Sequence, residues 1–177
     1  MERGTDFLKG QINNAVALHE TFIEALADHE KQADDPRFRN LCSKHIPEMR
    51  EHQRMLENYA KTLGAEQSSG KKALGKAMGF ARDLADSARE TDFLRLVGDI
   101  VMARQAEDTF KTFREAGKTL DNTELHRIGE RGERGHDAYV KEANRLVQQM
   151  FVDHVRGTTA SDVGASTDTS MGTGARA

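Results

Sequence analysis

The 177-residue sequence lacks tryptophan, has only two prolines and one cysteine, and contains no run of 18 apolar residues. A single cysteine, Cys42, excludes an internal disulfide and is most often a small core residue. Without a long apolar run no membrane-spanning helix is expected, and the N-terminus has no signal-peptide stretch. With 37% hydrophobic and 31% charged residues, the composition is typical of a helical, soluble protein, expected in the cytoplasm.

Charge of one sign is also missing. The net charge is -3, from 26 basic and 29 acidic residues that are interspersed along the chain. This balance gives no electrostatic attraction for nucleic acid or for a membrane surface. The length is that of one domain, large enough to bury a continuous core. The oligomeric state stays open, with a homodimer as one outcome.

Four segments carry apolar residues at alternating steps of three and four, the spacing that lines one face of a helix. The expected helices cover about residues 6–33, 36–64, 91–117 and 123–153. Asp35 and Pro36 form a cap and first turn, which predicts a tight connection between the first two helices. Asn122 is expected to cap the fourth helix after a second short turn.

The stretch from Gly64 to about Glu90 is too long for a hairpin turn. It passes from a Gly/Ser/Lys linker into a shorter helical pattern. The sequence therefore predicts an all-α fold, an antiparallel four-helix bundle of two helical hairpins joined by a long crossover with a short extra helix. The bundle domain covers residues 1–153. Residues 154–177 form a Gly/Ser/Thr-rich tail that is expected to be disordered.

Ionisable side chains interrupt the apolar seam of every helix near its middle, where they are costly unless paired or bound to a metal. Counted from the two expected turns they lie at one height, roughly 13 to 18 residues away, because each residue rises about 1.5 Å. The candidate metal ligands are His19 or Glu20, His45, Glu48, His52, Glu107, Glu133 and His136. His29 and His126, near the hairpin ends, are expected to be helix-end or surface residues.

This belt resembles the metal site of the ferritin-like carboxylate family. In that family two helices each give a Glu and two others each give Glu-x-x-His around two iron or manganese ions. The resemblance covers about residues 5–152. Glu107 matches the single carboxylate of one helix, and Glu133 with His136 matches the Glu-x-x-His of the next.

The first hairpin departs from the family pattern. Glu48 and His52 are one residue further apart than Glu-x-x-His, and His45 is additional. On the first helix His19 holds the seam position, with Glu20 rotated by about 100°. The layout is most similar to small bacterial ferritin-like proteins of stress-associated and uncharacterised families.

The resemblance implies a pair of iron or manganese ions that oxidise Fe(II) or react with oxygen or peroxide, as in a ferroxidase or a peroxide-reactive oxidoreductase. Histidine and glutamate donors suit such ions. Tyr59 and Tyr139 are candidates for hydrogen bonds to the ligands, or are ordinary seam residues. The alternative is a metal-free helical scaffold that dimerises or binds a protein partner. A hemerythrin-like oxygen carrier is disfavoured, because the third helix offers no histidine pair.

Three glycines, Gly129, Gly132 and Gly135, fall within two turns of the fourth helix. Each costs about 1 kcal/mol relative to alanine, so something must compensate. Two explanations remain open: space for a small molecule beside a metal, or close packing of helices against Phe22 or Phe110.

Overall fold

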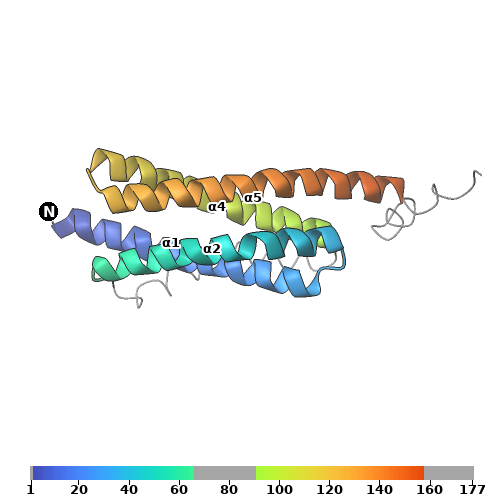
Figure 1. Ribbon diagram of the computed structural model, residues 1–177, viewed down its shortest axis with the longest axis horizontal. Coiled ribbons are helices and arrows are strands. Elements are labelled where there is room, and N and C mark those ends of the chain that lie inside the picture. The colour runs from blue at the N-terminus through green and yellow to red at the C-terminus, as the bar shows by residue number, and fades with distance from the viewer. Residues whose placement is uncertain (1, 66–90, 158–177) are drawn as a thin grey trace, which may run out of the picture.

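The computed structural model describes residues 2–65 and 91–157. Within these ranges the chain forms four long α-helices and no strand. They are α1 (Glu2–Gln32), α2 (Pro36–Thr62), α4 (Asp92–Thr119) and α5 (Thr123–Arg156). The helices run side by side along an elongated bundle (Figure 1). The predicted four-helix bundle is confirmed.

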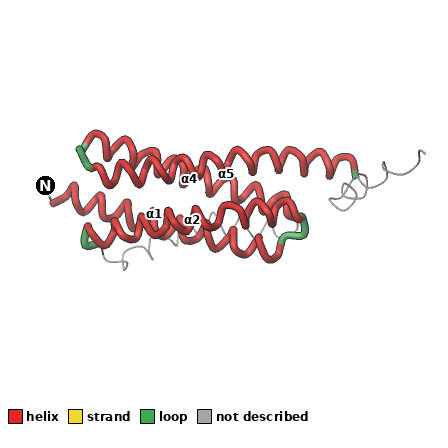
Figure 2. Tube along the Cα trace, in the orientation of Figure 1, coloured by secondary structure: helices red, strands yellow, loops and turns green. Residues whose placement is uncertain are grey.

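The two hairpin turns lie at opposite ends of the bundle (Figure 2). Besides the hairpin partners, α1 packs against α4 and α2 packs against α5. Because α2 ends at one end and α4 begins at the other, each helix is antiparallel to its packing partners. The predicted short helix of the crossover lies outside the described residues. None of the described helices combines the length and hydrophobicity that crossing a bilayer requires.

Side-chain caps begin the helices where the sequence predicts them. The Asp35 carboxylate accepts a hydrogen bond from the Arg37 backbone N–H at 2.8 Å, at the start of α2. Asn122 accepts from the Leu125 backbone N–H at 3.0 Å, at the start of α5. Such bonds satisfy donors that have no partner within the helix. α5 continues past the predicted end at residue 153 and stops at Gly157, which has a left-handed φ of 69°.

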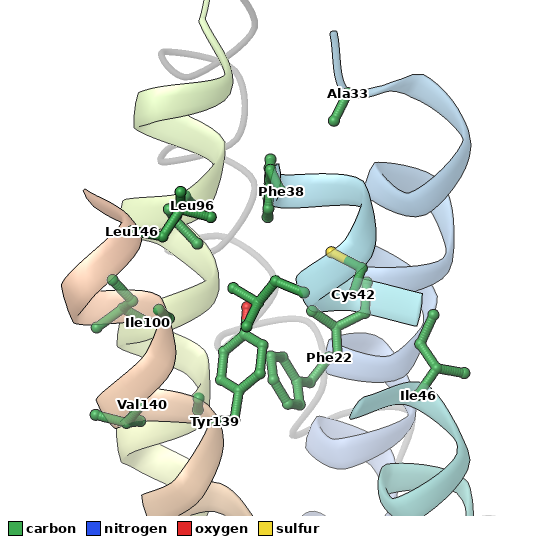
Figure 3. Close-up of a cluster of buried hydrophobic side chains, with 14 of the residues drawn as sticks. Phe22, Ala33, Phe38, Cys42, Ile46, Leu96, Ile100, Tyr139, Val140 and Leu146 are labelled. Atoms are coloured by element: carbon green, nitrogen blue, oxygen red, sulfur yellow. The ribbon is translucent and has the colours of Figure 1, made fainter. Parts of the chain in front are cut away.

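Among the described residues, the core consists of two apolar clusters. The cluster toward the α1–α2 turn includes Phe22, Phe38 and Tyr139 (Figure 3). The other includes Leu56 and Phe110. On α1, α2 and α5, one buried histidine lies along the chain between residues of the two clusters. The packed layers therefore hold a polar layer between them.

Helices α4 and α5 pack unusually close because α5 lacks side chains at the contact. A Cβ added to Gly129 would lie 2.2 Å from the Arg114 backbone nitrogen, and one added to Gly132 would lie 2.2 Å from the Phe110 ring. Atoms cannot approach so closely. For these two glycines, close helix packing is the compensation.

Candidate metal centre

Three buried histidines meet in the middle of the bundle. His19 comes from α1, His52 from α2 and His136 from α5, and one ring nitrogen of each lies within 4.8 Å of the others. The residues are 2%, 2% and 0% exposed. Both hairpins thus contribute to this three-histidine group, which the apolar seams of their helices direct inward.

Aromatic rings enclose the group. The Phe110 ring centroid lies 5.6 Å from that of His19, 5.9 Å from that of His52 and 5.1 Å from that of His136. The Phe22 ring lies 5.8 Å from His136. These apolar neighbours cannot hydrate a charged imidazolium, so the surroundings favour neutral rings.

Burial accordingly lowers the pKa of all three imidazoles. The pKa of His19 falls to about 4, and the pKa values of His52 and His136 each fall to about 3. Repulsion between the rings adds to the effect, from His136 on His52 and from His19 on His136. The three rings are therefore neutral at pH 7, the form in which imidazole binds a metal.

Hydrogen bonds fix the tautomers of two of the rings. His136 Nδ1 lies 2.7 Å from the Gly132 carbonyl oxygen and must donate, because a carbonyl only accepts. His19 Nδ1 lies 3.0 Å from Gln53 Oε1. In both rings Nε2 is buried and has no hydrogen-bond partner. The Nε2 lone pairs of His19 and His136 therefore lie in the core without a hydrogen-bond partner.

The third ring presents its other nitrogen. His52 Nδ1 is buried without a partner, and His52 Nε2 lies 3.9 Å from Glu48 Oε1. Gly135 gives this ring its place, since a Cβ there would lie 2.4 Å from His52 Cε1. A buried polar atom left unpaired costs about 1–3 kcal/mol. Three bare nitrogens in one group fit a metal ion that would accept all three lone pairs.

The carboxylates expected in the belt are not part of the three-histidine group. Glu20 is exposed, while Glu107 is half-buried, and burial is the main cause that raises its pKa. Glu133 forms an ion pair with Arg114. The Glu48 side chain is 52% exposed and touches only the edge of the group. Among the described residues, the group that brings at least three ligating side chains together contains histidines alone.

His45 is buried but lies outside the three-histidine group. Its Nε2 is 3.4 Å from Glu142 Oε2, and its ring packs edge-on against Tyr139. The Tyr139 hydroxyl is 3.5 Å from Asp99 Oδ2. The Tyr59 hydroxyl accepts a hydrogen bond from Asn122 Nδ2 at 2.7 Å, at the α4–α5 turn.

Several polar residues of the core escaped the sequence analysis. Asp99 is 0% exposed, and its Oδ2 lies 2.9 Å from Nδ1 of His29, which lies in the last turn of α1 as expected but is half-buried and paired there. Gln53 is 8% exposed and contacts His19. Each stands beside a seam residue: Asp99 precedes Ile100, and Gln53 follows His52. A place directly beside a residue of the apolar seam was therefore the sequence feature that could have indicated the burial of Asp99 and Gln53.

A small cavity lies between α1 and α4. His19 and Phe110 line it, together with apolar side chains that include Ala15, Leu56 and Ala106. Its volume of about 20 Å³ is enough for one water molecule. Between α1 and α4, only a molecule of about the size of water could therefore approach the three-histidine group.

Fold and site together define the class: a four-helix bundle with a buried histidine cluster, and bundle cores are common hosts of metal ions. The chain belongs to the family described as "Domain of unknown function (DUF892)", whose model matches residues 5–128. The match includes His19 and His52 and ends before His136. No curated protein and no solved structure matches the chain.

Proposed function

We propose that this protein binds one divalent transition-metal ion at the centre of the bundle. The ligands are His19 Nε2, His52 Nδ1 and His136 Nε2. The observation that carries the proposal is that these three nitrogen atoms are buried, lack hydrogen-bond partners and belong to rings that gather in one group. A bound ion would remove three unpaired polar atoms from the core at once.

The donor set narrows the choice of ion. Three neutral imidazoles suit zinc, copper, nickel or ferrous iron, whereas magnesium and calcium prefer oxygen ligands. A tetrahedral ion with bonds of about 2.0–2.1 Å would draw the three nitrogens to about 3.3 Å from one another. Its fourth position would be left for water or another small ligand. The outer partners Gln53 and Gly132, and Glu48 beside His52, would orient the rings.

The ferritin-like resemblance extends this proposal. Two hairpins joined by a long connection support kinship with ferritin-like carboxylate proteins. A pair of iron or manganese ions, with oxidation of Fe(II) or reaction with oxygen or peroxide, is the more specific version. It requires carboxylates to turn toward the histidines, and Glu48, Glu107 and Glu133 are the candidates.

Metal titration of chelator-treated protein tests the proposal. We expect one zinc or ferrous ion per chain, measured by calorimetry under anaerobic conditions and by elemental analysis. Replacing His19 or His136 with glutamine should weaken binding by more than about 100-fold. His45→Gln is the matched control, since it alters a buried histidine outside the group and should leave the affinity unchanged.

Other outcomes point elsewhere. Two ions per chain, with one lost in Glu107→Gln, would replace the single-ion site by the di-metal version. Absence of binding to any of zinc, iron and manganese would leave the metal-free scaffold, and the melting temperature would then not respond to metal or chelator.

A further inference from the structure

A chain of hydrogen bonds reaches the three-histidine group from outside. Gln53 Nε2 lies 2.9 Å from Glu57 Oε1 and 3.3 Å from the Val16 carbonyl oxygen. Gln53 Oε1 lies 3.0 Å from His19 Nδ1. Gln53 is buried, while Glu57 is only half-buried. These hydrogen bonds therefore lead from Glu57, which solvent reaches in part, to His19, a candidate ligand in the core.

The partners of Gln53 determine which way its amide faces. A carboxylate and a peptide carbonyl accept hydrogen bonds and cannot donate them. The amide nitrogen must face these two groups, because the reversed amide would oppose its oxygen to two other oxygens. The amide oxygen then faces His19, so His19 Nδ1 must carry the proton.

This proton decides whether His19 can bind a metal. A neutral imidazole carries one hydrogen, and with that hydrogen on Nδ1 the lone pair remains on Nε2. His19 Nε2 is the atom that is buried without a partner. The other tautomer would place a hydrogen on Nε2 and prevent it from coordinating an ion.

We infer that Gln53 is a positioning residue, oriented by Glu57, that holds His19 in its metal-binding tautomer. The functional role of this Glu57–Gln53–His19 relay of hydrogen bonds rests on the proposed metal site, whereas the tautomer of His19 is a property of the metal-free protein. Because Gln53 follows His52, one turn of α2 supplies both a ligand and the partner of a ligand on α1. A purely structural Gln53 would tie α1 to α2 without affecting the tautomer.

Long-range ¹H–¹⁵N NMR of the metal-free protein tests the relay by identifying which ring nitrogen of His19 is protonated. We expect protonated Nδ1 in the wild type and a mixture of tautomers in Gln53→Leu. In Glu57→Leu, a milder change at a half-buried position, we expect a partial shift toward the mixture. Gln148→Leu, on the exposed face of α5, is the matched control and should behave as the wild type.

A double variant supplies the rescue. Gln53→Glu combined with Glu57→Gln exchanges the carboxylate and the amide, so residue 53 still accepts from His19 and now accepts from residue 57, while the weaker 3.3 Å hydrogen bond to the Val16 carbonyl oxygen is lost. We expect Nδ1 to remain protonated in this variant. Zinc affinity should fall by about 10- to 100-fold in Gln53→Leu and return to within a few-fold of the wild type in the double variant.

The outcomes separate the two proposals. Protonated Nε2 in the wild type, or an unchanged tautomer in both leucine variants, overturns the relay. Unchanged zinc affinity in Gln53→Leu also overturns it and leaves the metal site standing. A tautomer that shifts as expected while the wild type binds no metal supports the relay and overturns the proposed function.

Discussion

The buried imidazoles should make the metal-free protein sensitive to acid. Folding lowers the pKa of His19 to about 4 and those of His52 and His136 to about 3, from an ordinary value of 6.5. Below pH 6.5 the unfolded chain therefore binds more protons than the folded chain, so the free energy of unfolding falls as the pH falls. Between pH 7 and 5 each histidine should remove about 2 kcal/mol, measured by urea denaturation with chelator present.

The variant His19→Gln isolates one of these contributions. Glutamine does not titrate, so the difference in stability between pH 7 and pH 5 should shrink by about 2 kcal/mol relative to the wild type. Other titrating groups are common to both proteins and cancel in the comparison. An identical pH dependence in the two proteins would show that the folded protein can hold His19 in its charged form.

Gly135 is the residue on which the place of His52 depends. An alanine Cβ there would lie 2.4 Å from His52 Cε1, and the ring has Phe110 and His136 on its other sides. Gly135→Ala should displace the ring and weaken zinc binding by about 10-fold or more, measured by competition with a chelating dye. Gly10→Ala, where an added Cβ meets nothing within 4 Å, is the matched control and should leave the affinity unchanged. Equal zinc affinities of Gly135→Ala and the wild type would mean that the His52 ring can move aside without weakening zinc binding.

Single residues also mark how far the sequence could predict the site. Seam spacing distinguishes His19, which is buried, from Glu20, which is exposed. It does not say how a long carboxylate side chain uses its freedom: Glu133 pairs with Arg114, a residue 19 positions earlier. Gln53 was missed because an amide is not a metal ligand. Histidine side chains are short and their helix face nearly determines their direction, whereas contacts of long side chains across the bundle depend on rotamers.

At the scale of elements, the glycines of α5 set its distance from α4. Gly129→Ala would place a Cβ against the Arg114 backbone, which cannot turn aside as a side chain can. We expect this variant to lose about 1–3 kcal/mol of unfolding free energy by overpacking. Gly10→Ala should instead gain about 0.5–1 kcal/mol through better helix propensity. Urea denaturation at one pH measures both, and a stabilised Gly129→Ala would contradict the close packing.

The helices themselves could be predicted well, because their signals are local. The apolar spacing predicts the helices and therefore the two hairpin turns. Asp35 with Pro36 predicts the start of α2, and Asn122 predicts the cap of α5, as the structure has them. The end of α5 was placed too early, at residue 153, since the polar sequence beyond it gives no apolar periodicity. How closely α4 and α5 pack could not be predicted. The sequence left two interpretations of the α5 glycines open, because the absence of a side chain does not reveal what occupies its space.

At the scale of the whole molecule, the three-histidine group joins the two hairpins. His19 and His52 belong to the first hairpin and His136 to the second, so a bound ion would add a link to the side-chain packing, hydrogen bonds and ion pairs, such as Arg37–Asp153, that already join the two hairpins. An ion that binds only the folded chain stabilises it by about 2.7 kcal/mol at 100 times its Kd. For a chain of this length the melting temperature should rise by about 5–10 °C. Differential scanning fluorimetry with and without zinc measures this shift.

The position of the link predicts more than a higher melting temperature. An ion held by both hairpins should slow backbone hydrogen exchange on α5 as well as on α1 and α2, because separating the hairpins would break coordination bonds. In His136→Gln an ion held by His19 and His52 alone would tie only the first hairpin, so any remaining protection should be confined to α1 and α2. Exchange measured by mass spectrometry in both proteins, with zinc and with chelator, distinguishes these patterns. Equal zinc protection of α5 in the wild type and the variant would show that His136 is not a ligand.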